Sequence, residues 1–333
     1  MKRNDTWQLT PLLVLMNIKE HIPLFLESSK ILASSIFLIY SISNYLQSPA
    51  EKNASEPQKH VERIANRKVV LFNESLNELV EFRIFCLIST TKPRHCERAI
   101  PVRTSWARRC DGVLFASDFQ DQYLPSEAFY NKTGREYVSF KIFTAWKYVY
   151  YRYIKNDQAS QDFQWFIKAD DDTFVVVENL RKVLSKMDHT KPHYMGRPLS
   201  KNKTIYHKRY GSGSIEILSA QALKMLVTKS MPNQDLCPLP QFKANEDAFL
   251  GFCLNSVGIT LQNGRDHNNR ERFLIYEIWK LALNVTLEDG ANNFALDAIS
   301  FHYMEAGKML AMEFLVHHLK PLGISIGTRV SDL

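Results

Sequence analysis

The sequence predicts an α/β protein in which helices flank a mostly parallel, twisted sheet. Short, mainly apolar runs at residues 82–89, 113–116 and 163–168 are typical of buried strands. A segment with helical features lies in each gap between them. Strands that alternate with helices in this way favour a parallel sheet. Such sheets bind ligands beyond the carboxyl ends of their strands, so we expect functional residues there.

Two helices are expected between these strands. Residues 98–109 can form the first, because Pro101 is tolerated near a first helical turn. Residues 135–154 can form the second, because aromatic side chains recur there at steps of three and four and mark a packed face. These aromatic residues are Tyr137, Phe140, Phe143, Trp146, Tyr150 and Tyr153.

Shorter elements follow the third strand, and Ser219 is placed to cap one of the helices. The expected strands are residues 194–197, 215–218 and 299–304, and the expected helices are residues 178–186, 245–255 and 308–319. We expect the globular domain that contains all these elements to begin near Glu81.

An uncharged and largely apolar segment occupies residues 31–50. A helix of that length can just cross a bilayer. The basic residues before it outnumber the acidic ones by one, which slightly favours a cytosolic N-terminus. The sequence therefore predicts a cytosolic tail at residues 1–30, a single transmembrane helix at 31–50 and a polar stem at 51–80. A helix buried in a soluble core is the alternative for the apolar segment.

Sequons and cysteines favour exposure to a secretory lumen. Five Asn-x-Ser/Thr sequons follow the apolar segment. They begin at Asn53, Asn73, Asn131, Asn202 and Asn284. The five cysteines show no close metal-ligand spacing, and in an oxidising lumen they suggest two disulfides and one odd thiol. Buried free cysteines of a cytosolic enzyme are the alternative.

Three consecutive carboxylates, Asp170, Asp171 and Asp172, follow the third expected strand. Three like charges at one rigid point repel one another unless a cation neutralises them. Side chains alternate in an extended turn, so Asp170 and Asp172 should point to one side and Asp171 to the other. The pattern indicates a divalent-cation site, whose remaining ligands would come from water and substrate phosphates. A solvated acidic turn is the alternative.

Three further side chains could complete such a site. A neutral imidazole suits Mn²⁺, and His302 lies in the apolar run 299–304, although a lone histidine on such a strand is more often a core residue. Glu246 and Asp247 begin a helix, whose dipole stabilises carboxylates. A carboxylate beside a metal-bound leaving group could also deprotonate an attacking hydroxyl group.

Several function classes lack support in the sequence. It contains no P-loop, no G-x-S-x-G and no H-E-x-x-H, and the residues after Asp170 lack the spacing of an EF-hand. The net charge of +7 is scattered, without a basic run interleaved with aromatic residues. We therefore expect no nucleic-acid partner, whereas a polyanionic nucleotide is compatible with this charge.

Four motifs carry a family resemblance in their combination and order. They are residues 103–110 (RTSWARRC), residues 165–175 (WFIKADDDTFV), Glu246-Asp247 with Gly251 and Cys253, and residues 300–303 (SFHY). Together they resemble the core 1 β1,3-galactosyltransferases, the T-synthase-like members of the β1,3-glycosyltransferases. The resemblance covers about residues 81–323 and leaves residues 324–333 as a tail.

The resemblance implies a single-pass type II Golgi membrane protein with a luminal GT-A catalytic domain, and a homodimer is also an expectation. Such enzymes transfer galactose from UDP-galactose to the 3-hydroxyl of O-linked N-acetylgalactosamine on glycoproteins, with inversion and with Mn²⁺. By motif match, Asp170, Asp172 and His302 would hold the metal ion. Asp247 would be the catalytic base, with Glu246 as its rival.

The resemblance also implies a donor site and two disulfides. The residues that would line the UDP-sugar site are Ser89, Gly134, Arg135, Lys141, Asp170 and Tyr303. The pairs Cys86 with Cys110 and Cys237 with Cys253 match cysteine positions of the family, which leaves Cys96 unpaired.

Two segments depart from the family pattern. The family's Gly-Gly-Ala-Gly-Tyr stretch is Ser212-Gly213-Ser214-Ile215-Glu216 here, and the aromatic-rich acceptor segment has become residues 272–293, with Trp279 but few other aromatics. The acceptor is therefore open, and a β1,3-transferase with another sugar or acceptor is one alternative. A non-catalytic chaperone-like relative is another, although such a protein should lose the acidic triplet, which this chain keeps.

Overall fold

The computed structural model describes residues 70–73, 78–155, 163–199, 210–238, 245–282 and 294–319. All of them belong to one compact unit, Gln58–Leu333. The predicted cytosolic tail, transmembrane segment and most of the stem lie outside the described residues, as do the tail at 324–333 and the sequons at Asn53, Asn202 and Asn284. Within the described residues, no helix has both the length and the apolar character needed to cross a bilayer.

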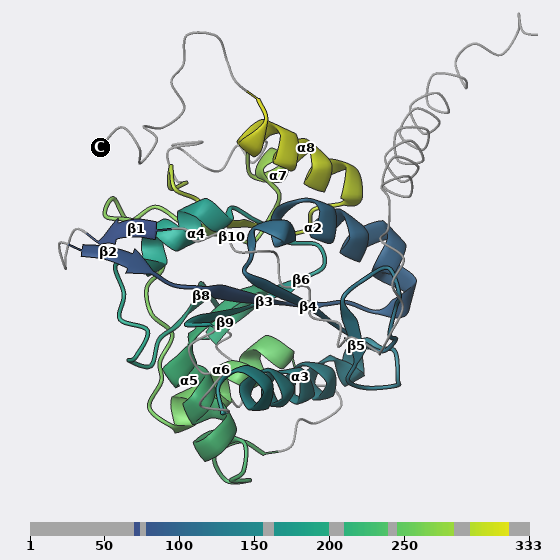
Figure 1. Ribbon diagram of the computed structural model, residues 1–333, viewed down its shortest axis with the longest axis vertical. Coiled ribbons are helices and arrows are strands. Elements are labelled where there is room, and N and C mark those ends of the chain that lie inside the picture. The colour runs from purple at the N-terminus through teal and green to yellow at the C-terminus, as the bar shows by residue number, and fades with distance from the viewer. Residues whose placement is uncertain are drawn as a thin grey trace, which may run out of the picture. The chain divides into compact units, whose positions relative to one another are not determined.

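A six-stranded mixed sheet forms the centre of the fold, in the order β5-β4-β3-β6-β9-β8 (Figure 1). Its strands are β3 (Ile84–Ser89), β4 (Gly112–Ser117), β5 (Ser126–Ala128), β6 (Trp165–Asp170), β8 (Tyr194–Leu199) and β9 (Tyr210–Ser219). Strands β5, β4, β3 and β6 are parallel, whereas β9 is antiparallel to both β6 and β8. The α/β prediction is confirmed, and the parallel arrangement holds for the first four strands in this order.

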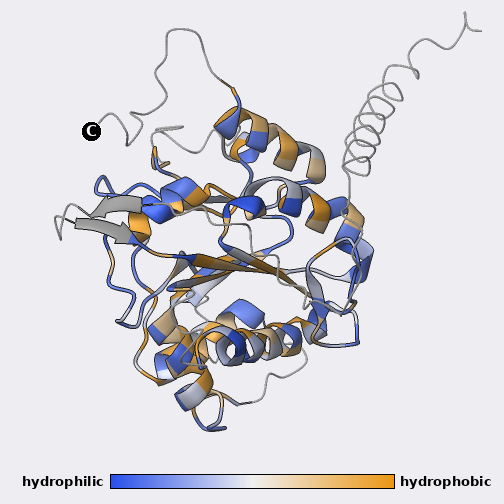
Figure 2. Cartoon of the chain, viewed as in Figure 1, coloured by the Kyte–Doolittle hydropathy of each residue, from blue (hydrophilic) through white to orange (hydrophobic). Residues whose placement is uncertain are grey.

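Helices cover both faces of this sheet because its strands are apolar on both sides. The helices α3 (Val138–Tyr153), α5 (Ala220–Met225) and α6 (Glu246–Ser256) pack on one face. The helices α2 (Ile100–Thr104), α4 (Val177–Leu184) and α8 (Ala306–His317) pack on the other. Apolar residues are concentrated in the strands between these two layers (Figure 2). The side chain of Ser219 caps α5 as predicted, accepting a hydrogen bond from the Ala222 amide at 3.1 Å.

The helix predicted at residues 98–109 is broken into three pieces. A π-helical turn at His95–Ala99 leads into α2, and a 3₁₀ turn follows at Trp106–Arg109. The break falls at Ser105, whose φ of −98° and ψ of −111° are not helical. The Ser105 hydroxyl donates to the Pro101 carbonyl at 2.6 Å and competes with the helical bonding of the backbone there. The second predicted helix is almost intact, as a 3₁₀ turn at Arg135–Tyr137 followed by α3.

A small three-stranded sheet joins the acidic turn to the C-terminal part of the domain. Its order is β10-β11-β7, where β7 is Phe174–Val175, β10 is Phe273–Leu274 and β11 is Ser300–Phe301. The strand predicted at 299–304 is therefore only two residues long, because the chain turns at Tyr303, which has a φ of 59°. The hairpin of β1 (Val70–Asn73) and β2 (Glu78–Glu81) precedes the central sheet.

Both disulfides implied by the family resemblance are present. Cys86 in β3 is bonded to Cys110, and Cys237 is bonded to Cys253 in α6. Cys96 is a free, exposed thiol. The first bridge fastens the 3₁₀ turn Trp106–Arg109 to the central sheet, and the second fastens α6 to the segment that follows α5.

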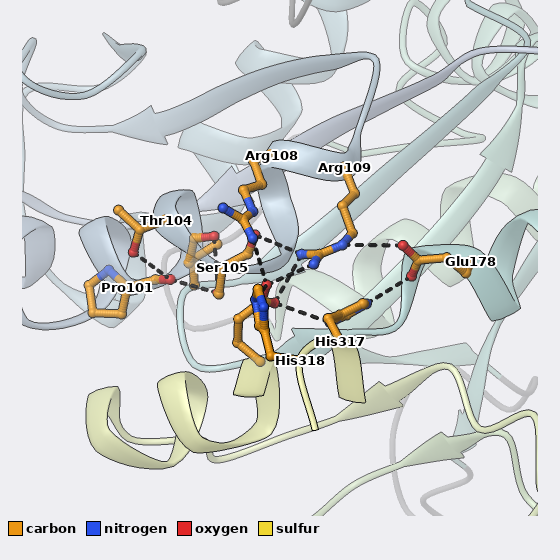
Figure 3. Close-up of polar contacts among 10 residues, drawn as sticks. Pro101, Thr104, Ser105, Arg108, Arg109, Glu178, His317 and His318 are labelled. Carbon is orange, nitrogen blue, oxygen red and sulfur yellow. Dashed lines mark hydrogen bonds and ion pairs between the residues drawn. The ribbon is translucent and has the colours of Figure 1, made fainter. Parts of the chain in front are cut away.

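A cluster of charged side chains attaches α8 to the rest of the domain (Figure 3). The Arg109 guanidinium contacts the Glu313 carboxylate of α8 at 2.7 and 2.9 Å and the Glu178 carboxylate of α4 at 3.2 Å. His317 lies between the same two carboxylates, 3.1 Å from Glu178 and 3.3 Å from Glu313. Burial alone would raise the pKa of Glu313, but its hydrogen bonds and charge interaction with Arg109 hold that pKa below the usual value. The cluster thus fixes α8, which begins just after Tyr303.

Candidate functional site

The predicted site residues line one cleft of about 1140 Å³ at the carboxyl ends of β3 and β6. Ser89 ends β3 and is paired directly with Asp170, which ends β6. Polar side chains from both strands therefore meet at one edge of the parallel half of the sheet, where ligands of such sheets bind. The predicted residues that line this cleft are Ser89, Gly134, Arg135, Lys141, Asp170, Asp172, Glu246, Asp247, His302 and Tyr303.

Asp170, Asp172 and His302 form a group with the chemistry of a divalent-metal site. One ligand atom from each lies within 4.8 Å of the others. His302 Nε2 is 3.1 Å from Asp172 Oδ1 and 3.9 Å from Asp170 Oδ2. Burial alone would raise the pKa of Asp172, but the hydrogen bond and charge of His302 lower it. Two carboxylates and one imidazole at these separations could hold a divalent metal ion.

Asp171 has a different place, as the alternation of side chains predicted. It is buried, and its carboxylate accepts a hydrogen bond from the Thr90 hydroxyl at 2.8 Å. Its amide donates to the Ser89 carbonyl at 3.2 Å. Burial raises the pKa of Asp171 to about 6. This residue therefore fastens the acidic turn to the end of β3.

Two arginines that the sequence analysis did not identify face the acidic turn. Arg98 Nη1 is 2.8 Å from Asp172 Oδ2 and 3.7 Å from Asp171 Oδ1, and Arg94 Nη1 is 3.7 Å from the same Asp171 oxygen. Both guanidinium groups balance carboxylate charge that would otherwise be concentrated in the turn. No local pattern links Arg98 to Asp172, because they are 74 residues apart.

Lys168 is the centre of the polar network beneath the cleft. Its side chain is almost fully buried, and its ammonium group contacts the Gly213 carbonyl at 2.9 Å, Glu246 Oε2 at 2.8 Å and Asp170 Oδ1 at 3.0 Å. An ammonium group has three N–H donors, and here each of them has an acceptor. Burial alone would lower the pKa of Lys168, but the charges of Asp170 and Glu246 raise it well above its usual value. Lys168 is therefore a buried cation.

Glu246 and Asp247 differ in their burial and in their contacts with this network. Glu246 is buried and occupied by Lys168, whereas Asp247 is partly exposed to the cleft. Asp247 accepts hydrogen bonds from the Gly213 amide at 3.2 Å and from the Ala248 amide at 2.8 Å. Two amide donors orient its carboxylate and leave it accessible, which favours Asp247 over Glu246 as a base.

Gly213 approaches this network closely. An added Cβ atom there would lie 3.5 Å from Lys168 Nζ, 3.6 Å from Asp170 Oδ2 and 3.7 Å from the Asp247 Cβ. A side chain longer than that of alanine would extend into the cleft between the metal-site carboxylate and Asp247. Gly213 thus keeps one glycine of the family stretch in a place where a small residue is needed.

Glu216 occupies the position of the aromatic residue in that family stretch. It lies directly opposite Lys168 in the pairing of β6 with β9, and its side chain is fully buried. Neither carboxyl oxygen has a hydrogen-bond partner among the described residues. Burial and then the charge of Glu246 raise the pKa of Glu216 well above 4.5, against the opposing effect of Lys168. A buried carboxyl group without a hydrogen-bond partner favours its neutral form.

One wall of the cleft carries two basic residues. Lys141 on α3 is buried, and its ammonium group donates to the Thr90 carbonyl. Burial lowers the pKa of Lys141 to about 8, against the raising effect of Asp118 and Asp171. Gly134, with a φ of 142°, begins the 3₁₀ turn that places Arg135 on the same wall. This wall offers positive charge to an anionic ligand.

Comparison with known proteins places this architecture in a family. Residues 80–302 match the family described as Fringe-like, which is more than half of the chain. The chain belongs to the Fringe-like family. This Fringe-like chain is 28% identical over 267 residues to the glycoprotein-N-acetylgalactosamine 3-beta-galactosyltransferase 1 of Xenopus laevis, an alignment that covers 75% of the chain and 70% of that protein. The resemblance stated from the sequence motifs is thereby confirmed.

Other relatives of the Fringe-like chain are also glycosyltransferases. The mouse beta-1,3-glucosyltransferase is 24% identical over 179 residues, which cover 53% of the chain and 34% of that protein. The chain spans only about a third of the length of this second relative. A solved glycosyltransferase involved in the glycosylation of the major capsid of PBCV-1 overlaps 70% of the chain and 100% of its own length, with 12% identity and a TM-score of 0.41. The family match and the sequence relatives show that the Fringe-like chain is a glycosyltransferase-like enzyme.

The segment in which we expected the acceptor to bind is only partly described, because residues 283–293 lie outside the described ranges. Its described part includes α7 (Ile278–Ala282), on which Trp279 is 36% exposed. Tyr276, just before α7, was not identified from the sequence, although its ring contacts that of Tyr303 in the cleft.

The first prediction concerns Lys168. The variant Lys168→Met removes the buried ammonium group and leaves the Glu246 carboxylate without its counter-ion. The free energy of unfolding should fall by about 3–5 kcal/mol, as is usual when one member of a buried ion pair is removed. Urea denaturation would measure it. The exposed Lys147 on α3 is the control, and Lys147→Met should change stability by less than about 0.5 kcal/mol. Equal stabilities of the two variants would contradict the central role of Lys168.

The second prediction concerns the pH dependence of stability at Glu216. A group whose folded-state pKa is raised contributes stability that is complete below its unfolded pKa, here about 4.5, and is lost as the pH rises towards the folded value. The variant Glu216→Gln cannot ionise. Its free energy of unfolding, relative to the wild-type value, should therefore rise between about pH 4.5 and pH 7. Denaturation at several pH values would measure this, with the exposed Glu97→Gln as control. A difference that is flat with pH would mean that the native carboxyl is ionised.

Proposed function

We propose that this chain is an inverting, Mn²⁺-dependent GT-A-type β1,3-glycosyltransferase. In this proposal it transfers galactose from UDP-galactose to the 3-hydroxyl of O-linked N-acetylgalactosamine on glycoproteins. The observation that carries the proposal is the group of Asp170, Asp172 and His302 in the floor of the cleft. The similarity to a galactosyltransferase named for a glycoprotein N-acetylgalactosamine acceptor supports the choice of donor and acceptor.

The metal site in this proposal consists of Asp170, Asp172 and His302. Bound there, Mn²⁺ would neutralise the developing charge of the diphosphate leaving group. Lys168 holds Asp170 at 3.0 Å, and His302 and Arg98 hold Asp172 at 3.1 and 2.8 Å, so both carboxylates are oriented before any ligand arrives. Such orientation by neighbouring side chains is typical of metal ligands.

The donor in this proposal lies along the basic wall of the cleft. Lys141 and Arg135 offer positive charge to the diphosphate, and Ser89 and Gly134 border the same space. Tyr303, which is 55% exposed, adds an aromatic ring to the lining of the cleft. These residues would bind the donor in the cleft that Asp247 also lines.

The catalytic base in this proposal is Asp247. Its carboxylate takes the proton of the acceptor hydroxyl as the oxygen attacks the anomeric carbon of the donor. The attack comes from the face opposite the leaving diphosphate, so one displacement inverts the configuration. The Gly213 and Ala248 amides hold the carboxylate in place during this step. Glu246 stays in its ion pair with Lys168.

The proposed setting is the Golgi lumen, with the chain anchored as a single-pass type II membrane protein. The uncharged segment at residues 31–50 and the sequons after it support this setting. The two disulfides support it as well, because such bonds persist mainly in oxidising compartments. Homodimerisation is also part of the proposal.

A transferase with another sugar or acceptor is the second candidate. The chain is also similar to a beta-1,3-glucosyltransferase and, over 34% of its length, to the beta-1,3-N-acetylglucosaminyltransferase lunatic fringe of Xenopus laevis. Glu216 and the altered segment 272–293 are the chain's own features that favour this candidate. A panel of UDP-sugars with Mn²⁺ and several glycoside acceptors would decide between them. If no sugar is hydrolysed or transferred and UDP does not bind, the chain is a non-catalytic relative.

The third prediction separates the metal site from the base. Asp172→Ala should abolish Mn²⁺-dependent UDP binding, because the site loses one of its two carboxylates. Asp247→Ala should keep that binding and lower the turnover number about 10²–10⁴-fold, the usual contribution of a general base. Calorimetry with UDP and a transfer assay would measure the two effects. The exposed Asp188→Ala is the control and should change neither. Unchanged turnover in Asp247→Ala would move the base to Glu246 or to another residue.

The fourth prediction concerns the charge of Lys141. Its pKa of about 8 means that the ammonium group is protonated below that pH and loses its charge above it. UDP affinity should therefore fall as the pH rises from 7 to 9, by about tenfold if one charge-assisted hydrogen bond is lost. Titrations of the wild-type protein and of Lys141→Gln would show this. The variant should bind weakly at every pH, and an equally steep decline in both proteins would exclude Lys141 as its cause.

A further inference from the structure

A stack of aromatic rings connects the candidate metal ligand His302 to the segment before α7. The rings of His302 and Tyr303 are stacked with centroids 4.0 Å apart and an interplanar angle of 19°. The Tyr303 ring is stacked in turn on that of Tyr276, with centroids 5.9 Å apart and an angle of 27°. Lys280 Nζ lies 4.3 Å from the centre of the Tyr276 ring and ends the series. The stack therefore runs from the cleft to α7.

The backbone holds the two ends of this stack in register. Leu274 in β10 pairs with Phe301 in β11, and its carbonyl accepts a hydrogen bond from the His302 amide at 3.2 Å. On the other side, the Met304 amide donates to the Asp172 carbonyl at 2.8 Å. The residues before Tyr276 thus run beside the residues before His302, and the acidic turn lies next to both.

Tyr303 has a backbone conformation that needs support. Its φ of 59° is in the left-handed region, which bulky residues rarely adopt. Such conformations persist when the surrounding structure determines them, and they concentrate at functional sites. In this chain the left-handed conformation of Tyr303 lets its ring lie between the ring of the adjacent His302 and the ring of Tyr276. Contact with Tyr276 therefore helps to hold Tyr303 in this position.

An imidazole ring must also be held at the correct angle to serve as a metal ligand. The torsion that turns a histidine ring is broad, so a neighbouring group has to define it. Metal-binding histidines are usually oriented by such neighbours, and replacement of these neighbours weakens metal binding. In this chain a ring stacked nearly parallel at 4.0 Å restricts rotation of the His302 ring and keeps Nε2 3.1 Å from Asp172.

We propose that Tyr276 is a positioning residue for the metal site, acting on His302 through Tyr303. The proposal rests on the proposed function in taking His302 as a metal ligand. It assigns a contribution to the metal site to residues 272–293, one of the two segments that depart from the family pattern. Lys280 supports the far face of Tyr276 through a cation–π contact.

The test compares Tyr276→Ala, Tyr276→Leu and Tyr276→Phe in the full chain. Calorimetric titration with Mn²⁺ should give an affinity about tenfold or more weaker for the alanine and leucine variants, the usual loss when a supporting group is removed. The phenylalanine variant keeps the stacked ring and should stay within about twofold of the wild-type affinity. Tyr151→Ala, at an exposed tyrosine on α3, is the matched control and should bind Mn²⁺ normally.

A second measurement needs no metal ion. In protein labelled with ¹³C-histidine, the ring signals of His302 can be assigned by their absence in His302→Gln. The alanine and leucine variants should shift these signals, because the Tyr303 ring no longer holds its place, and the phenylalanine variant should not. The leucine variant keeps most of the side-chain volume, so it serves if the alanine variant does not fold.

The two measurements distinguish failure of this proposal from failure of the proposed function. Wild-type Mn²⁺ affinity and unshifted His302 signals in the leucine variant would overturn the positioning role of Tyr276. A wild-type chain that binds no Mn²⁺ would overturn the metal site and, with it, this role. Normal metal binding by the variants would count against the role of Tyr276. Independently, a wild-type chain that transfers sugar to no acceptor would count against the proposed function.

Discussion

The buried ammonium group of Lys168 is the interaction on which the arrangement of the cleft depends. It contacts a carboxylate of the candidate metal site, a carboxylate at the start of α6 and the carbonyl of Gly213. Gly213 in turn donates to Asp247. One cation therefore sets the spacing between the metal-binding side of the cleft and the base. Three acceptors are needed because a buried ammonium group without partners would be costly.

Much of the fold could be predicted from local sequence patterns. The apolar runs at β3, β4 and β6 and the aromatic period of α3 are local signals, and each element formed close to its predicted bounds. The position of Asp170 at a strand end brought the acidic turn to the correct edge of the sheet. The break at Ser105 was missed because it depends on one side chain that bonds to the backbone.

The partners of the site could not be predicted in the same way. Arg98 reaches Asp172 across 74 residues, and Lys168 reaches Glu246 across 78, so only the folded chain brings them together. Glu216 resembles an ordinary strand residue in the sequence. Only the pairing of β6 with β9 shows that it lies opposite Lys168. Tyr276 became relevant through the turn at Tyr303, whose left-handed backbone no sequence period indicates.

The cluster around Arg109 and Glu313 has a consequence for the order in which the protein is made. The acidic pair of the candidate metal site is synthesised long before His302, and α8 is the last described helix to leave the ribosome. Until α8 docks, Arg109 lacks its Glu313 partner, and the turn that carries His302 is held on its C-terminal side by the bond from the Met304 amide to the Asp172 carbonyl. All six strands of the central sheet are therefore synthesised before the turn that carries His302. A chain that ends before Ser300 would contain every strand of the central sheet and still lack His302.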